Sequence, residues 1–164
     1  MRAVAVVKHC LKSTQDTMLM FLGDLSDADL TKRPVPSANN IAWQLAHLIV
    51  AEKMLLEGEL PGAKYPEIPA AIVSLGSERT GKVDPPGGYL PKTQYLEWAG
   101  KLRGITIAAV DKLSESDLDK ANTGMMAKHA PTLGELLILI GNHTLMHGGQ
   151  FTVVRRALNK PVVF

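Results

Sequence analysis

The chain has 164 residues, of which 46% are hydrophobic and 21% charged, and its net charge is +2 at pH 7. This length favours a single domain, which we place over residues 1–164, and it allows a core to be buried without disulfides. The small net charge and the lack of a dense run of Lys and Arg argue against a nucleic-acid partner, which needs a clustered basic surface.

The single cysteine, Cys10, excludes an internal disulfide and favours a reducing compartment. The apolar runs are far shorter than the roughly 18 residues of a membrane span, and the first residues lack the long apolar core of a signal peptide. We therefore expect a cytoplasmic protein with no membrane partner.

Three long helices are predicted from the periodicity of apolar residues in the first two thirds of the chain. The first covers about residues 4–22. After a polar stretch with two prolines, the second covers residues 40–58, and Gly58 and Pro61 end it. The third covers about residues 92–113.

A long connection rich in Pro and Gly, residues 61–91, separates the second and third of these helices, and a short helix is expected near residues 70–75. A fourth long helix begins at a capping box formed by Thr132 and Glu135 and continues to about Leu158. No strand signal is long enough to build a sheet. Four helices with two long connections predict an all-α protein, a four-helix bundle.

Three histidines fall on the predicted core-facing sides of two helices. At about 100° per residue, His143 and His147 lie about 40° apart within an apolar arc of the fourth helix. Their spacing places the two side chains on one side, about 5–6 Å apart at Cβ. His47 lies on the apolar arc of Trp43 in the second helix and can meet the pair across the bundle. Three neutral imidazoles would hold one divalent metal ion and leave coordination positions open.

The plainer interpretation is that these histidines are hydrogen-bonded residues of the core. The sequence contains no Glu-x-x-His motif of a di-iron carboxylate site, no His-Glu-x-x-His motif of a zinc protease and no CxxCH motif of haem attachment. Glu52 points in a different direction from His47 on the second helix, and we expect its carboxylate to be a solvated charge. Met125 and Met126 could cover a pocket. Further pocket or ligand-supporting candidates are Trp43, Asn142 and Gln150.

The stretches SANNIAWQLAHLIVAE and GNHTLMHGGQFTVVRRALNKP resemble the DinB-like family, and the spacing of helices and loops fits that family over nearly the whole chain. The H-x3-H-x-G-Q pattern is the most specific part. The resemblance implies a four-helix bundle with a histidine triad, which falls on His47, His143 and His147. It also implies one divalent metal ion (nickel, zinc, iron or manganese) and a frequent homodimer.

Two further apolar arcs also favour a homodimer. In the second helix Leu45, Ile49 and Leu56 lie away from the histidine, and in the fourth Ile138 and Leu145 lie opposite the other two. Helices that are apolar on two sides are buried on two sides, either by a second copy or by the chain's own elements.

Some members of the family that this chain resembles are transferases or isomerases that use bacillithiol, mycothiol or a similar small thiol. The resemblance therefore implies a metal-dependent small-thiol S-transferase with a small-molecule substrate, in which the metal activates a thiol or water. A metal-dependent hydrolase and a non-enzymatic metal- or small-ligand-binding protein of the same fold are the alternatives, because one fold hosts many chemistries. The sequence does not assign catalytic residues or decide whether the protein is an enzyme.

Overall fold

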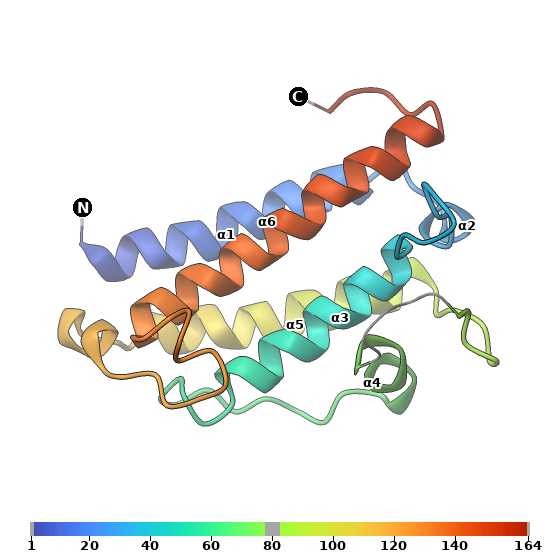
Figure 1. Cartoon of the computed structure of the whole chain (residues 1–164). Coiled ribbons are helices and arrows are strands. Elements are labelled where there is room, and N and C mark those ends of the chain that lie inside the picture. The colour runs from blue at the N-terminus through green and yellow to red at the C-terminus, as the bar shows by residue number, and fades with distance from the viewer. Residues whose placement is uncertain (1, 78–82, 164) are drawn as a thin grey trace.

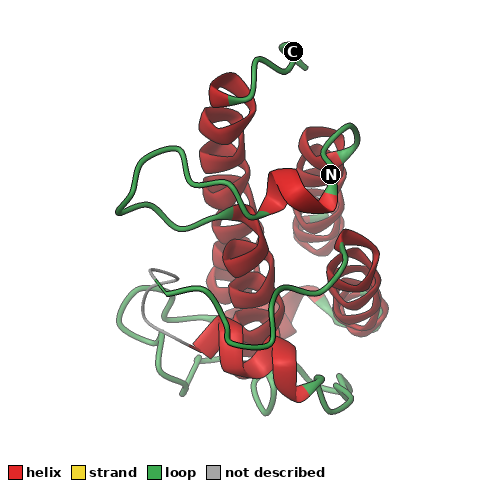
Figure 2. Ribbon diagram, turned by 90° about the vertical axis from the view of Figure 1, so that its right-hand side faces the viewer, coloured by secondary structure: helices red, strands yellow, loops and turns green. Residues whose placement is uncertain are grey.

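The computed structural model describes residues 2–77 and 83–163, and four long helices form a bundle in it (Figure 1). These helices are α1 (Ala3–Leu22), α3 (Ile41–Leu56), α5 (Lys92–Val110) and α6 (Leu133–Ala157). α1 packs along α6, and α3 packs along α5. The described residues contain helices and loops but no strand (Figure 2). The predicted all-α four-helix fold is confirmed.

Three short helices complete the described elements: α2 (Asp27–Leu30), α4 (Ala70–Ser77) and the 3-10 helix η1 (Glu115–Asp119). α4 confirms the short helix expected in the long connection, and it packs against α3. η1 packs against α6. None of the helices in residues 2–77 and 83–163 is both long and apolar enough to cross a membrane.

Side-chain caps fix where the two histidine-bearing helices begin. The Asn40 side chain accepts a hydrogen bond from the Trp43 backbone N–H at 2.9 Å, directly before α3. The predicted capping box of Thr132 and Glu135 is present at the start of α6. Because each cap satisfies an N–H that the helix itself leaves free, it holds the register of the residues that follow.

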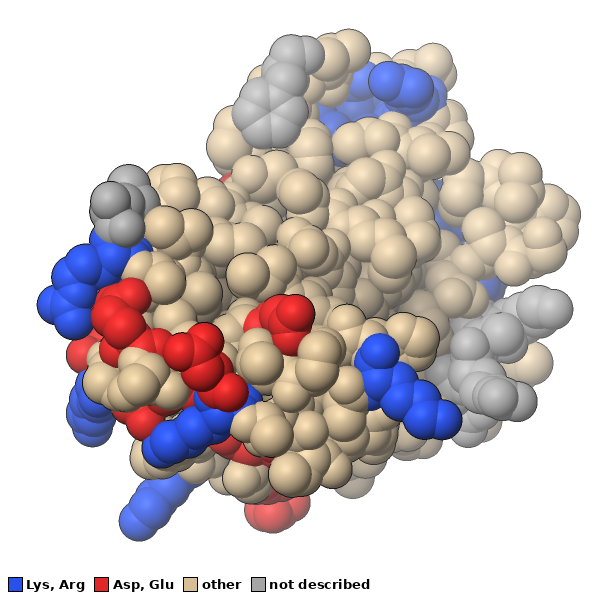
Figure 3. Space-filling model, turned by 60° about the vertical axis from the view of Figure 1, so that its left-hand side comes forward, with Lys and Arg blue, Asp and Glu red and all other residues tan. Residues whose placement is uncertain are grey.

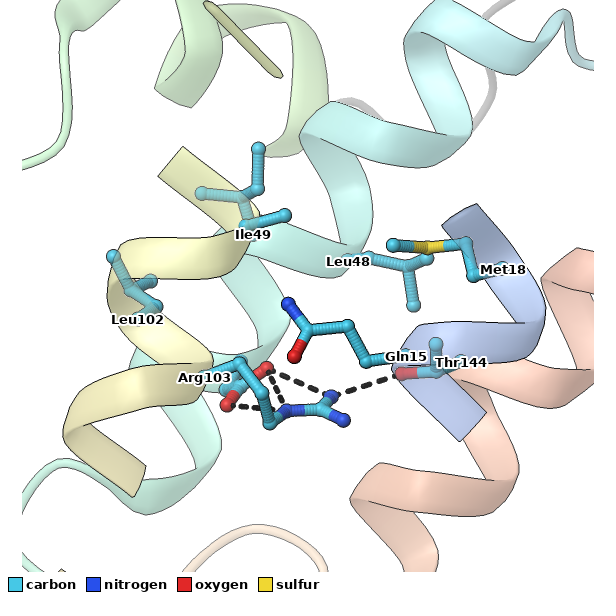
Figure 4. Close-up of a pocket in the computed structure, with 9 residues that line it drawn as sticks. Gln15, Met18, Leu48, Ile49, Leu102, Arg103 and Thr144 are labelled. Atoms are coloured by element: carbon cyan, nitrogen blue, oxygen red, sulfur yellow. Dashed lines mark hydrogen bonds and ion pairs between the residues drawn. The ribbon is translucent and has the colours of Figure 1, made fainter. Parts of the chain in front are cut away.

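A buried polar network links all four long helices, and Figure 4 shows the part of it that joins α3, α5 and α6. The guanidinium of Arg103 on α5 forms an ion pair with Glu52 on α3 at 2.9 Å, and it donates to the Leu11 carbonyl of α1 at 2.7 Å and to the Thr144 hydroxyl of α6 at 3.0 Å. Glu52 is only 7% exposed, so the expectation that it is a solvated charge is wrong. Its charge is matched by Arg103, which lies far away in sequence. The network ties α3 to α6, the two helices that carry the histidines.

Of the two apolar arcs that were expected to be buried by a second copy, the structure covers the arc on α3 with the chain's own helices. Leu45, Ile49 and Leu56 are at most 1% exposed, because the chain's own helices cover them. This arc of α3 is therefore not available to a second copy. Ile138 and Leu145 on α6 are 41% and 46% exposed. Figure 3 shows a face of the molecule on which charged side chains gather towards the lower left and leave a wide uncharged area above them.

Candidate metal centre

Three imidazoles meet between α3 and α6. His47 comes from α3, and His143 and His147 come from successive turns of α6. Their candidate ligand atoms all lie within 4.8 Å of one another. The ring centroid of His47 lies 5.1 Å from that of His143 and 5.4 Å from that of His147. The Nε2 atoms of the α6 pair are 3.1 Å apart, so these two nitrogens face each other. We call this cluster the histidine triad.

Gln44 orients the most deeply buried member of the triad. Its Oε1 lies 2.9 Å from Nδ1 of His147 and accepts the N–H of that ring. Its Nε2 donates to the Asn39 carbonyl at 3.1 Å, which turns the amide oxygen towards the histidine. With Nδ1 of His147 protonated, Nε2 carries the lone pair and faces the other rings. A partner of this kind, behind a ligating histidine, fixes the tautomer and the ring orientation.

His47 is held from two sides. Its Nδ1 lies 3.3 Å from the Gly76 carbonyl at the end of α4, which can accept the ring N–H. The Trp43 ring stacks on the imidazole at a centroid distance of 4.9 Å and an interplanar angle of 5°. A Cβ on Gly76 would lie 2.4 Å from the Ala46 carbonyl oxygen, so only glycine allows α4 to approach α3 this closely. Close packing of the two helices thus places the carbonyl that orients His47.

Burial keeps two members of the triad neutral. Desolvation, assisted by the neighbouring histidines, lowers the pKa of His143 to about 4 and that of His147 to about 3, from an ordinary value of 6.5. Both rings are therefore unprotonated at pH 7, which is the state that can bind a metal ion. A set of three imidazole nitrogens suits the divalent ions of the first transition row. The donor set thus fits the predicted metal.

A cleft of about 540 Å³ opens beside the triad. His47 and His143 line it, whereas His147 is only 5% exposed and is not part of the lining. The rest of the lining consists of Ala51, Met54, Leu55, Met125, Met126, Leu139, Asn142 and Met146. Its volume lies within the roughly 300–1,000 Å³ of small-molecule sites. The cavity beside Arg103 in Figure 4 is about 20 Å³, which is room for a water molecule and not for a substrate.

The residues predicted to surround the triad have different positions. Trp43 stacks on a triad histidine, and its buried Nε1–H has no partner among the described residues. Asn142 lines the cleft. Gln150 is exposed on α6 and does not belong to the cleft lining. Sequence reasoning overlooked Gln44, although it lies one helical turn before the α3 histidine. It also overlooked Gly76, whose contact follows from the packing of α4 and has no sequence signal.

The histidine positions fall within a family match that covers most of the chain. The model of the DinB superfamily matches residues 11–151. A solved structure described as the crystal structure of the conserved protein of locus from Enterococcus faecalis is similar, with a TM-score of 0.68 and 14% sequence identity. The alignment covers 98% of this chain and 99% of that chain, and at this identity it shows the fold alone. No curated protein matches the chain.

Proposed function

The chain belongs to the DinB superfamily, and on that premise we propose that its histidine triad holds one divalent metal ion for a small-thiol transferase reaction. The observation that carries the proposal is the convergence of His47, His143 and His147 within 4.8 Å, with two of the three lining a cleft of about 540 Å³. When bound, the metal would lower the pKa of a thiol or water and supply a nucleophile at neutral pH.

The surrounding residues prepare the triad for this role. Gln44 and the Gly76 carbonyl accept Nδ1–H groups, so the lone pairs of these two rings are on Nε2. Nε2 of His147 faces Nε2 of His143 at 3.1 Å, and a bound ion would replace the hydrogen bond between them. His147 is buried behind the cleft, whereas His47 and His143 line it, so a substrate in the cleft would meet these two rings. Nitrogen ligands of this kind accept nickel, zinc, iron(II) or manganese, and metal availability in the cell decides among them.

The lining of the cleft favours thiol transfer over hydrolysis. Among the described residues that line it there is no carboxylate or lysine that could act as a general base. Hydrolysis of an ester or amide also needs a proton donor for its leaving group, whereas a metal-bound thiolate that displaces a halide releases an anion that needs no proton. A reducing, cytoplasmic location, which the single cysteine of the chain favours, would keep such a thiol reduced. The metal-dependent hydrolase is therefore the weaker alternative.

Turnover of a thiol with an electrophile tests the proposal. Zinc-, nickel-, iron(II)- and manganese-loaded chain would be compared with metal-free chain, using bacillithiol or mercaptoethanol and a chromogenic aryl halide. We expect adduct formation above the uncatalysed rate with metal only, and loss of that rate in His47→Ala. His129→Ala is the matched control, because His129 is exposed and lies outside the triad. Stoichiometric metal without turnover for any thiol would instead identify a non-enzymatic binding protein.

The exposed side of α6 is the surface that we propose for a homodimer. Three apolar side chains of α6, Ile138, Leu145 and Val153, are 41%, 46% and 51% exposed. A second copy would remove these apolar side chains from water. Light scattering after size exclusion should give twice the chain mass for the parent and a monomer for Leu145→Lys. A monomeric parent at tens of micromolar would contradict the proposal.

A further inference from the structure

We propose that the cleft beside the triad selects an uncharged, largely apolar small molecule, so that the group presented to the metal is attached to an aromatic or aliphatic body. This inference rests on the proposed function for the role of the triad, but its own basis is the chemistry of the cleft wall. Of the lining residues, only His47, His143 and Asn142 are polar. Every other lining side chain is alanine, leucine or methionine.

The cleft offers no partner for a charge. Among the described residues that line it there is no Lys, Arg, Asp or Glu, and Asn142 contributes the single amide. A carboxylate, phosphate or ammonium group that entered this space would lose part of its water and gain no opposite charge, which is unfavourable. A ligand that carries a charge within the cleft is therefore disfavoured, whereas a charge that extends beyond the exposed methionines of the wall keeps its water.

Four methionines from three separate segments form much of the apolar wall of the cleft. Met54 comes from α3, Met125 and Met126 from the connection before α6, and Met146 from α6. Met54, Met125 and Met146 are 51%, 66% and 55% exposed, so apolar surface stands uncovered around a concave site. Unbranched thioether side chains adapt to ligands of different shape and make favourable contacts with aromatic rings. Apolar surface left open around a pocket marks a binding site.

A small molecule fits these observations better than a protein partner. The space is a pocket of about 540 Å³ whose wall includes two histidines of the triad, which is the size and form of a small-ligand site. Buried apolar positions of the wall, such as Ala51 and Leu55, are 3% and 9% exposed and give the pocket depth. The competing possibility is that a side chain of a second copy occupies the cleft, which would make the cleft methionine signals depend on protein concentration.

The test uses two probes that share a thiol and a ring and differ in one charge: phenylmethanethiol and its para-carboxylate. The chain has seven methionines, whose isotope-labelled methyl groups report binding site by site in NMR spectra. Both probes would be titrated into zinc-loaded and metal-free full-length chain. Because the thiol is common to both, its contribution at the metal cancels in the ratio of affinities. We expect the neutral probe to bind at least about tenfold more tightly and to shift the cleft methionines.

A matched pair of variants places the binding site. Met146→Lys adds a charge to the cleft wall and should weaken the neutral probe about tenfold while strengthening the carboxylate. Met20→Lys makes the same change on α1 at a similar exposure, 47% against 55%, and outside the cleft, so it should leave both affinities unchanged. Equal affinities for the two probes in the parent, or equal effects of the two variants, would overturn the inference.

The remaining outcomes separate this inference from the proposed function. Cleft methionine signals that shift with protein concentration, without any probe, would show that a second copy fills the cleft and would overturn the inference. A chain that holds no metal but keeps its preference for the neutral probe would refute the metal site and support the apolar cleft. A chain that holds zinc at the triad but prefers the carboxylate would refute the apolar cleft alone.

Discussion

Gln44 allows a direct test of how the histidine triad is prepared for a metal. It accepts the Nδ1–H of His147 at 2.9 Å, and it is only 1% exposed. Gln44→Met keeps the length of the side chain and removes the acceptor, so the ring loses the bond that fixes its tautomer. Removing such a partner lowers metal affinity about 10- to 100-fold, or about 1.4–2.8 kcal/mol. The N–H left buried without a partner should cost a further 1–3 kcal/mol or so of folding stability.

Competition for zinc against a chromophoric chelator measures the affinity, and urea unfolding of the metal-free chain measures the stability. Gln44→Glu keeps an acceptor and should bind zinc at least as tightly as the parent. Thr106→Val removes a buried hydroxyl that donates to Glu52 at 2.6 Å, away from the triad, and should lower stability without changing zinc affinity. Parental zinc affinity in Gln44→Met, or an equal loss in Thr106→Val, would refute the role assigned to Gln44.

Three further predictions follow from buried groups. Burial lowers the folded-state pKa of His143 and His147 to about 4 and about 3, so the metal-free chain takes up protons on unfolding below pH 6.5. Its free energy of unfolding in urea titrations should therefore fall by roughly 2–4 kcal/mol between pH 7 and pH 5. A parent with flat stability over that interval would contradict this. Gly76→Ala forces α4 away from α3 and should lower zinc affinity about tenfold. Gly100→Ala, where a Cβ meets nothing within 4 Å, should leave zinc affinity unchanged. Equal affinities in the two variants would show that the Gly76 carbonyl does not help to hold the metal. Arg103→Leu leaves the Glu52 carboxylate buried and unpaired and should lower the free energy of unfolding in urea by about 3–5 kcal/mol. Adding Glu52→Leu to the same chain should restore much of this stability, and a loss below about 1 kcal/mol in the single variant would show that the pair is solvated.

The long helices can be predicted from the sequence because their signals are local. Apolar periodicity and the capping box at Thr132 predict α6 to within one residue of its observed end, and α5 ends at Val110 instead of Leu113. α2 and η1, with four and five residues, are too short to show a period. Each nevertheless begins with a capping box, at Ser26 and at Ser114, in which aspartate replaces the usual glutamate. That signal could have predicted both.

The convergence of the triad follows from helix geometry, whereas its surroundings depend on tertiary packing. His143 and His147 share a helix face by their spacing alone, and the apolar arc of α3 turns His47 towards them. The burial of Glu52 could not be predicted, because Arg103, its partner, lies on a different helix. The methionine wall of the cleft depends on the path of the connection before α6, for which periodicity gives no information.

The metal content of the chain, purified without a histidine tag, is the most direct test of the central claim. Parent and His143→Ala/His147→Ala variant would be measured together, with folding checked by circular dichroism. The triad predicts close to one divalent ion per chain in the parent and loss of that ion in the folded variant. A parent that binds no nickel, zinc, iron(II) or manganese on titration, or a variant that keeps full occupancy, would contradict the account and leave the histidines as hydrogen-bonded residues of the core.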